Sequence, residues 1–302
     1  MPELPDVEVY VSALGPRVVG EKLLAIRLAS PFLLRTVEPS LPSFFGQTVQ
    51  GVRRIGKRIA LVFPAERFLV VHLMIAGRFH WKAVGAKVPG KVGLAAFDFP
   101  RGTLTLTEAS PKKRAALHAL DGVTALAALD PGGLEVLTAD RATFAATLIR
   151  ERHTLKRSLT DPHLFSGIGN AYSDEILHHA RLSPVTMCDR LSDAEITRLY
   201  ASTRAVLTDW VARLRAEVGE GFPERVTAFR PDMGVHGRYG QPCPRCGASV
   251  QRIVYAANEA NYCPTCQTGG KLLADRSLSR LLKADWPRTV EELEIRRRPP
   301  GA

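Results

Sequence analysis

Apolar side chains recur at helical spacing near the start of the chain. Val7, Val11, Leu14 and Val18 fall three or four positions apart, which places them on one face of a helix. Pro5 suits the first turn of a helix, and the acidic residues around it suit the positive end of the helix dipole. The pattern therefore predicts a helix that begins near residue 5.

Short β-rich runs replace this helical pattern between residues 23 and 107. The clearest runs cover residues 58–63, 68–74 and 102–107, and turns that contain proline or glycine separate them. This alternation predicts a β-sandwich or a β-barrel.

Helical spacing returns after an Asp-Pro-Gly-Gly turn at residues 130–133. Ser192 and Glu195 have the spacing of a capping box, and an apolar helical pattern follows them. A domain boundary is therefore expected near residue 131. Near the end of the chain, leucines predict one more amphipathic helix, followed by a Pro-rich, basic end that we expect to fray. These leucines are Leu272, Leu273, Leu278, Leu281 and Leu282.

The charge of the chain points to a polyanionic partner. The 302 residues include 41 Lys and Arg against 30 Asp and Glu, a net charge of +11. The excess lies at the two ends, with +7 over residues 1–130, −1 over residues 131–237 and +5 over residues 238–302. A basic surface attracts phosphates, so nucleic acid is the leading partner. An anionic membrane surface or plain solubility would also fit the charge.

The chain lacks the pattern of a membrane span and of a signal peptide. Its longest apolar run, residues 68–74, is interrupted by His72 and is much shorter than the ~20 residues that cross a bilayer. The first residues are acidic, whereas a signal peptide begins with cationic ones. We therefore expect a cytoplasmic protein, nucleoid-associated if bacterial, that acts as a monomer and does not bind membranes.

Four cysteines have the spacing of zinc ligands. Cys243 and Cys246 form one C-x-x-C pair, and Cys263 and Cys266 form a second pair after sixteen intervening residues. Each pair aims two thiolates at one metal ion, and a closed four-cysteine site leaves no position for substrate. We expect one structural zinc ion on a β-hairpin, with residues 250–255 as a strand. A redox dithiol is the alternative.

The second residue could act as an unusual nucleophile. Removal of Met1 would expose Pro2 as a secondary amine, which can attack an aldehyde-level carbon and form an iminium. Glu3 could then serve as a general acid or base. From these residues alone, ordinary methionine trimming is the simpler interpretation.

A glycine-rich turn precedes a helical pattern in the middle of the chain. Gly167 and Gly169 expose backbone N–H groups where the helix would start, and Asn170 adds a side-chain donor. This arrangement is typical of a phosphate-binding nest. A glycine-rich turn between two helices is the alternative.

Several motifs taken together resemble the formamidopyrimidine-DNA glycosylase and endonuclease VIII family. They are MPELPDVE at the start, RRIGKRIAL, VVHLMIAGRF, SGIGNAYSDEIL and the final C-x2-C-x16-C-x2-C pattern, and they extend over residues 1 to about 270. The resemblance implies a multidomain α+β fold in four parts. These are an N-terminal catalytic domain with a helix on a β-sandwich (1–130), a helix-two-turn-helix DNA-binding domain (131–237), a zinc-finger β-hairpin (238–270) and a C-terminal tail (271–302).

The resemblance also implies an activity and a set of site residues. Members of the family excise oxidised bases from damaged DNA and cut the resulting abasic strand. Pro2 matches the proline that attacks the anomeric carbon of the sugar, and Glu3 matches the glutamate that assists ring opening and proton transfer. Lys57 and Asn170 match residues that contact phosphates, and Glu8 matches a second acidic residue of the opening motif.

The residues that fill the void left by the flipped base depart from the family pattern. Met74 stands one position early, and Ile75 occupies the usual methionine site. Met74 is nevertheless the residue expected to contact DNA. The second loop, residues 110–115, has no aromatic residue and ends on Ala115. An alanine cannot stack on a base, so strand separation must be arranged differently. Basic residues of this loop are expected to bind DNA, namely Lys112, Lys113 and Arg114.

Other departures concern the opening motif, the finger and the lesion loop. Asp6 replaces the usual glutamate, and Asn258 replaces the finger arginine expected five residues before Cys263. Arg252 is a candidate to replace that lost cation. Residues 219–242 are also too few for the long loop that covers 8-oxoguanine in some members. These features favour oxidised pyrimidines, or abasic and single-stranded DNA, as substrates.

Three classes of function therefore compete. The first is a base-excision repair glycosylase with abasic-site lyase activity, and the second is a non-catalytic zinc-containing protein of the same fold that binds DNA damage. The third is a zinc-ribbon protein of RNA binding or translation. The intact Pro2 and Glu3 favour the enzyme, and the third class leaves the opening motif unexplained.

Overall fold

The computed structural model describes residues 1–297 except residues 225, 228, 256–257 and 275–285. The chain forms two compact units. The first consists of Met1–Gly133 and Thr208–Ala228, and the second of Leu134–Leu207 and Phe229–Ala302. None of the described helices combines the length and the apolar character needed to cross a membrane.

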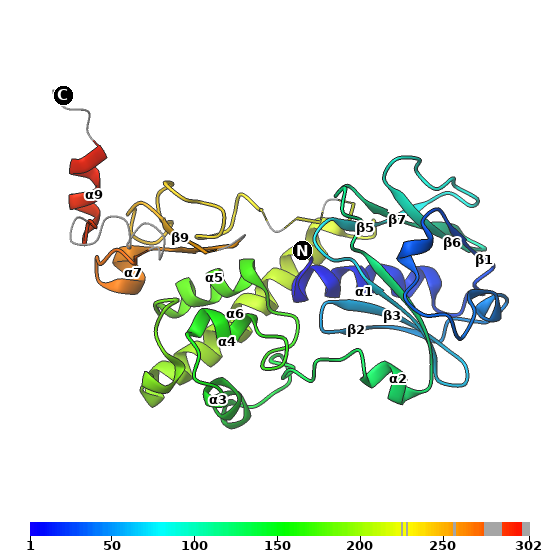
Figure 1. Cartoon of the computed structure of the whole chain (residues 1–302), viewed down its shortest axis with the longest axis horizontal. Helices are drawn as coiled ribbons and strands as arrows, with labels where there is room; N and C mark the ends of the chain where they lie inside the picture. Colours follow the sequence, from blue (N-terminus) through cyan, green and yellow to red (C-terminus); the bar gives the residue numbers. More distant parts are fainter. Residues whose placement is uncertain (225, 228, 256–257, 275–285, 298–302) are drawn as a thin grey trace. The chain divides into compact units, whose positions relative to one another are not determined.

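The first unit is an antiparallel β-sandwich with one long helix, as the sequence predicts. Figure 1 shows the helix α1 (Leu4–Val18) lying between the two sheets. One sheet contains, in order, β1 (Ala25–Leu28), β6 (Gly93–Phe99), β7 (Gly102–Glu108) and β5 (Gly77–Lys82). The other contains β2 (Gly51–Ile55), β3 (Arg58–Phe63), β4 (Arg67–His72) and β8 (Ala116–Asp121). The short helices of this unit are η1 (Pro31–Leu33), η2 (Leu41–Phe44) and α2 (Val123–Ala127).

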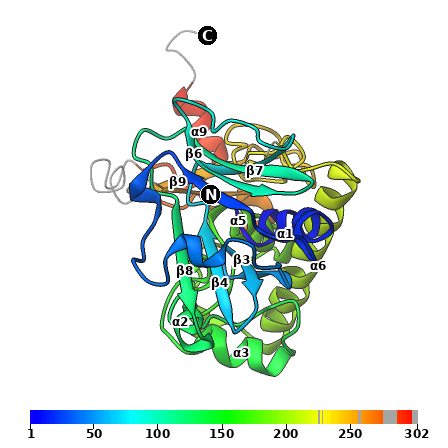
Figure 2. The same ribbon diagram turned by 90° about the vertical axis from the view of Figure 1, so that its right-hand side faces the viewer.

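The core of this unit joins α1 to both sheets, which are seen from a second direction in Figure 2. Tyr10 and Leu14 of α1 pack with Leu61 and Val71 of one sheet and Phe97 of the other, and all of these side chains are buried. Burial of apolar surface from three elements in one cluster stabilises the sandwich and fixes the position of α1.

One predicted strand ends earlier than its apolar pattern suggests. Residues 58–63 and 102–107 are in strands β3 and β7, but the run 68–74 stops at His72. The next residues turn sharply, because Met74 has a left-handed backbone with φ 53° and the Gly77 N–H donates to the Leu73 carbonyl at 2.8 Å. A Cβ at Gly77 would lie 2.2 Å from that carbonyl oxygen, so only glycine fits there.

Helices dominate the second unit. They are α3 (Arg141–Ile149), α4 (Leu155–Thr160), α5 (Asn170–Ala180), η3 (Cys188–Arg190) and α6 (Asp193–Val218), the last of which belongs to the first unit from Thr208 onward. The predicted capping box before α6 is confirmed, because the Ser192 N–H donates to Glu195 Oε2 at 2.9 Å and the Glu195 N–H to Ser192 Oγ at 3.3 Å.

A small hairpin follows these helices and carries the cysteines. Its strands are β9 (Gln251–Tyr255) and β10 (Asn258–Tyr262), followed by α7 (Pro264–Thr268) and later by α9 (Val290–Arg297). The predicted strand over residues 250–255 is therefore confirmed. Most of the predicted leucine-rich helix and the last residues of the predicted frayed end lie outside the described residues.

Candidate functional site

The start of α1 holds the two residues predicted to be catalytic. Pro2 and Glu3 are both buried, and Glu3 is the N-cap of the helix. The Glu3 N–H donates to Asp6 Oδ2 at 3.0 Å, which is one half of a capping box. Asp6 thus completes the cap although it is shorter than the usual glutamate. The cap holds the backbone on either side of Pro2 and Glu3 in a fixed direction.

Charged groups of the first unit surround the beginning of the chain. Burial lowers the pKa of the Met1 amine below its ordinary value. The charges of Arg78 and Lys57 lower this pKa further, and those of Glu3 and Asp6 oppose the shift. These effects require proximity, so the first unit brings Glu3 and Lys57 together beside the terminal amine.

Lys57 occupies the tight turn between β2 and β3. Gly56 precedes it with φ 57°, a left-handed conformation that glycine adopts without strain. Burial lowers the pKa of Lys57, while the carboxylate of Glu3 raises it. The ammonium group is therefore held in a half-buried position close to Glu3, where it could meet an anion.

Two further polar residues near Lys57 were not predicted from the sequence to be part of a site. Arg58 and His72 face each other across β3 and β4, and Arg58 Nε and His72 Nε2 are buried without a hydrogen-bond partner among the described residues. Burial, then the charges of Arg58, Lys57 and His118, lower the pKa of His72 to about 4. Arg58 Nε–H is a buried donor without an acceptor, which is costly, so it is suited to bind an acceptor such as a phosphate; the role of His72 Nε2 depends on the tautomer of its ring. The only signal in the sequence was the polar His72 that interrupts an apolar run.

The two apolar residues of the turn after β4, Met74 and Ile75, differ in their exposure to solvent. Met74 is half-buried, whereas Ile75 is 59% exposed. Ile75 is therefore the more prominent side chain of this turn, although Met74 was the residue predicted to contact DNA.

The loop at residues 110–115, the second of the two loops expected to fill the void left by a flipped base, is held by Glu108. The Ala115 N–H donates to Glu108 Oε2 at 2.9 Å, and Lys113 Nζ donates to the Glu108 carbonyl. Ala115 is buried in the core of the sandwich and so presents no surface to a base. Lys112 and Arg114 remain exposed on the loop. Of the three predicted basic residues, these two are therefore better placed than Lys113 to contact phosphates.

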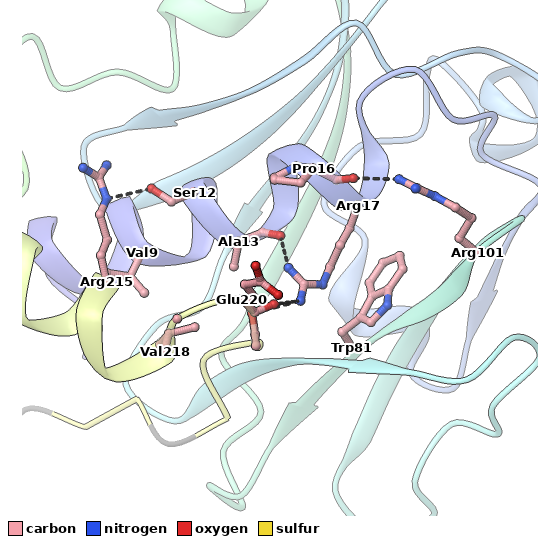
Figure 3. A pocket seen from close by; sticks show the side chains of 12 residues that line it. Val9, Ser12, Ala13, Pro16, Arg17, Trp81, Arg101, Arg215, Val218 and Glu220 are labelled. Carbon is pink, nitrogen blue, oxygen red and sulfur yellow. Dashed lines mark hydrogen bonds between the residues drawn. The ribbon is translucent and has the colours of Figure 1, made fainter.

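A cavity of about 710 Å³ in the first unit has a different character (Figure 3). Trp81 and the guanidinium groups of Arg17, Arg101 and Arg215 line it. Arg17 donates to the carbonyls of Ala13, Glu220 and Gly221 at 2.7, 2.7 and 2.9 Å, so its charge holds the end of α6 against α1. Neither the predicted nucleophile nor its neighbours line this cavity. It is therefore not the pocket that the opening motif predicts.

In the second unit, the glycine-rich turn leads directly into α5, as the sequence predicts. Gly167 has φ 76°, Gly169 is the N-cap, and Asn170 is the first residue of the helix. The first N–H groups of a helix have no intrahelical acceptors, and they carry the positive end of its dipole. Together with the side chain of Asn170, they form a surface suited to a phosphate.

A buried charged network supports the start of α5, and the sequence reasoning missed it. Asp174 Oδ1 accepts from Lys156 Nζ at 2.6 Å, and Asp174 Oδ2 lies 2.8 Å from His236 Nδ1. Lys156 Nζ also donates to the carbonyl of Asn170 at 2.6 Å. The adjacent Glu175 accepts backbone N–H groups of residues 234–236 at 2.7–2.9 Å. The network therefore joins α4, the beginning of α5 and the segment before the finger.

The four predicted metal ligands meet at one point. The Sγ atoms of Cys243, Cys246, Cys263 and Cys266 all lie within 4.8 Å of one another. A tetrahedral zinc ion with Zn–S bonds of about 2.3 Å requires S–S separations of about 3.8 Å, so the sulfur atoms fit one zinc. His178 Nε2 of α5 lies 3.2 Å from Cys243 Sγ, which links the finger to the helix that starts at Asn170.

Arg252, the candidate to replace the cation lost at Asn258, lies in the strand opposite it. Asn258 is the first residue of β10 and pairs with Tyr255 of β9. Arg252 is already engaged, because its Nη1 atom lies 3.2 Å from Glu259 Oε2 and its guanidinium lies 4.4 Å above the ring of Tyr239. These contacts hold Arg252 against Glu259 of β10 and against Tyr239, which precedes the hairpin.

Three family models match consecutive parts of the chain. The formamidopyrimidine-DNA glycosylase N-terminal domain matches residues 1–131, the H2TH domain of the same glycosylase matches residues 133–218, and the zinc finger found in FPG and IleRS matches residues 240–269.

Similar proteins extend over most of the chain. An uncharacterized formamidopyrimidine-DNA glycosylase-like protein from Mycobacterium tuberculosis is 46% identical over 156 residues, which are 52% of this chain and 95% of that protein. The formamidopyrimidine-DNA glycosylase of Chloroflexus aggregans is 31% identical over 275 residues, 88% of this chain and 98% of that protein. A solved complex of the Lactococcus lactis Fpg with DNA containing an abasic site has a TM-score of 0.76 at 26% identity, and the match covers 88% of this chain and 99% of that one.

Proposed function

The chain belongs to the formamidopyrimidine-DNA glycosylase family, and we propose that it excises oxidised bases from damaged DNA and cuts the abasic strand through an iminium at Pro2. It is a DNA-repair glycosylase and lyase, and its four cysteines hold one structural zinc ion. The observation that supports the mechanism is the start of α1, where a buried proline and a buried carboxylate lie beside Lys57. The zinc ion stabilises the finger, and each chemical step falls to groups of the chain itself.

The chemistry begins with removal of Met1, which frees the secondary amine of Pro2. The nitrogen lone pair attacks C1′ of the damaged nucleoside, and the bond from C1′ to the base breaks as the base leaves with its electron pair. The attached nitrogen then gives up its proton to a base. Glu3 in its protonated form gives a proton to O4′ while the C1′–O4′ bond breaks, and the nitrogen lone pair forms the iminium bond to C1′. Loss of a C2′ proton expels the 3′ phosphate, and water releases the enzyme.

The surroundings of the amine favour this role. Only an unprotonated amine can attack. Burial lowers the pKa of the Met1 amine, and Pro2, whose amine takes its place once Met1 is removed, is itself buried. Lys57, with the buried donor of Arg58, would hold a phosphate of the same strand. Asn170 at the start of α5 would bind a second phosphate.

The proposed substrate preference follows from the turn after β4 and the loop at residues 110–115, the two segments expected to fill the void left by a flipped base. Because Ala115 is buried in the core and Ile75 has no ring, neither of these two loops offers an aromatic ring to stack where a base has been extruded. Extruding a base from a duplex costs a few kcal/mol. We therefore propose that the enzyme, acting as a cytoplasmic monomer, prefers oxidised pyrimidines and lesions in single-stranded or bubble DNA. Single-turnover cleavage that is clearly faster in duplex DNA would contradict this preference.

Borohydride trapping on DNA with an abasic site tests the mechanism. The wild-type protein should lack Met1 in intact-mass analysis and form a stable covalent adduct through Pro2. A protein whose N-terminus is chemically blocked should form none, which is a cleaner control than Pro2→Gly because glycine keeps a terminal amine. An undiminished adduct after blocking would assign the nucleophile to a lysine. Tight binding of abasic DNA without any adduct would instead identify a non-catalytic damage-binding protein.

A further inference from the structure

A second cavity lies in the second unit, and neither Pro2, Glu3 nor Lys57 lines it. Its volume is about 280 Å³. That is close to the lower limit of roughly 300 Å³ for small-molecule sites, so it suits a single small unit of a ligand. The residues that line it are Phe229, Arg230, Pro231, His236, Gly237, Arg238 and Gln241.

An exposed aromatic ring forms one wall of this cavity. The Phe229 ring stacks on the His236 ring, with centroids 5.6 Å apart and an interplanar angle of 21°. His236 is buried, whereas Phe229 is 71% exposed, so the stack covers one side of the phenyl ring and leaves much of it in solvent. A Cβ at Gly237 would lie 2.9 Å from Phe229 Cδ1, so the absence of a side chain there lets the ring approach the backbone closely.

The wall is anchored to the predicted phosphate site of the same unit. His236 is held by Asp174, Asp174 by Lys156, and Lys156 Nζ donates to the carbonyl of Asn170, with contacts of 2.6–2.8 Å. A stacking surface supported by a buried network loses little conformational freedom when it binds a flat ligand. It is also connected to the residue at the start of α5.

Two of the residues that line the cavity are arginines. Arg230 and Arg238 line it, and the described residues of its lining include no carboxylate. Arg238 Nη1 donates to the carbonyl of Met233 at 2.9 Å, which fixes the direction of its guanidinium group. An exposed ring beside two cations is complementary to a nucleotide, which combines a flat base with a phosphate.

We propose that this cavity binds one unpaired nucleotide of the DNA strand, with its base stacked on Phe229 and its phosphate near Arg230 and Arg238. The inference rests on the proposed function, since the strand is the one on which the enzyme acts. It gives the preference for opened DNA a physical basis, because a base paired in a duplex cannot present its face to the ring.

The test uses the full zinc-loaded chain and an undamaged single-stranded oligonucleotide that carries 2-aminopurine, whose fluorescence is quenched by stacking. Phe229→Ala should weaken binding by roughly 5- to 150-fold, the range that corresponds to the stacking of one base, and should abolish the quenching. Phe229→Trp should restore both. Phe32→Ala is the matched control, because Phe32 is 77% exposed in the first unit and should leave affinity unchanged. Equal affinities of Phe229→Ala and the wild type would overturn the proposal.

Further experiments distinguish a DNA strand from a free nucleotide as the ligand. They also distinguish failure of this proposal from failure of the proposed Pro2 chemistry. A free mononucleotide that competes as well as the oligonucleotide at equal concentration would overturn the assignment to a DNA strand. Arg230→Gln should reduce the salt dependence of single-strand binding by about one counterion. An equal loss of affinity for single strand and intact duplex in Phe229→Ala would also contradict the unpaired nucleotide. Since this binding needs no Pro2 amine, failure of borohydride trapping would reject the chemistry and leave the Phe229 result interpretable.

Discussion

Replacing Asp174 by alanine should destabilise the second unit by about 3–5 kcal/mol, the usual cost of removing one partner from a buried ion pair. The side chains of Asp174 and Lys156 are 0% and 6% exposed, and their charged atoms are 2.6 Å apart. The substitution would leave the Lys156 ammonium buried without its counter-charge, and it would also remove the acceptor of His236. Water cannot reach Lys156 well enough to compensate, so most of the desolvation cost remains.

Urea denaturation followed by circular dichroism measures this effect. For a unit of this size, the expected loss corresponds to a lower melting temperature by about 6–20 °C. The matched control is Asp189→Ala, because Asp189 pairs with Arg152 at 3.0 Å with side chains that are 41% and 73% exposed. An exposed pair contributes only about 0–1 kcal/mol, so this variant should stay close to the wild type.

A double variant tests whether the buried charge is the cause. Lys156→Met combined with Asp174→Ala removes both charges, so it should be more stable than Asp174→Ala alone. The reasoning would be refuted if Asp174→Ala cost no more than Asp189→Ala, or if the double variant were simply the sum of two losses. DNA affinity gives a second readout, because the same Lys156 supports the carbonyl of Asn170.

Three further predictions concern other parts of the molecule. Asp6→Ala should cost about 1 kcal/mol of stability through loss of the capping contact to the Glu3 N–H, whereas Asp6→Glu should retain it, as thermal unfolding can show. For His72, burial and the neighbouring cations lower the pKa from 6.5 to about 4, so the unfolded chain binds the proton more readily than the folded one. Stability should therefore fall as the pH drops from 6.5 toward 4, and His72→Gln should lose less over this window in urea titrations; parallel curves would contradict the assignment. Cys263→Ser should lower zinc content, measured by elemental analysis, together with DNA affinity, and normal lesion binding without metal would exclude the finger from the DNA site.

Features that depend on neighbours along the chain could be predicted from the sequence. The helix after Pro5, the capping box at Ser192 and the start of α5 after Gly169 are specified by residues within a few positions of one another. The zinc ligands are predictable for the same reason, since each C-x-x-C pair is a local turn that aims two sulfur atoms in one direction.

Motif matching predicted the residues of the opening site but not their surroundings. That Lys57 lies beside Glu3 follows only from the packing of α1 between the two sheets. The turn after His72 ended a strand that the apolar run predicted to continue, because Gly77 must approach the Leu73 carbonyl. Apolar pattern reports burial, and it cannot report where the backbone has to turn.

Long-range polar contacts were decided by the tertiary structure alone. Asp174, Lys156 and His236 are common residue types at separations of 18 and 62 positions, so the sequence contains no signal that they share one buried network. The sequence did not predict the proposed stacking role of Phe229 either, because this role depends on Gly237 and the buried His236, which approach the ring only in the folded chain. Local chemistry acts between neighbours in the chain, whereas burial changes the energy of a charge or a ring only after distant segments have excluded water from it.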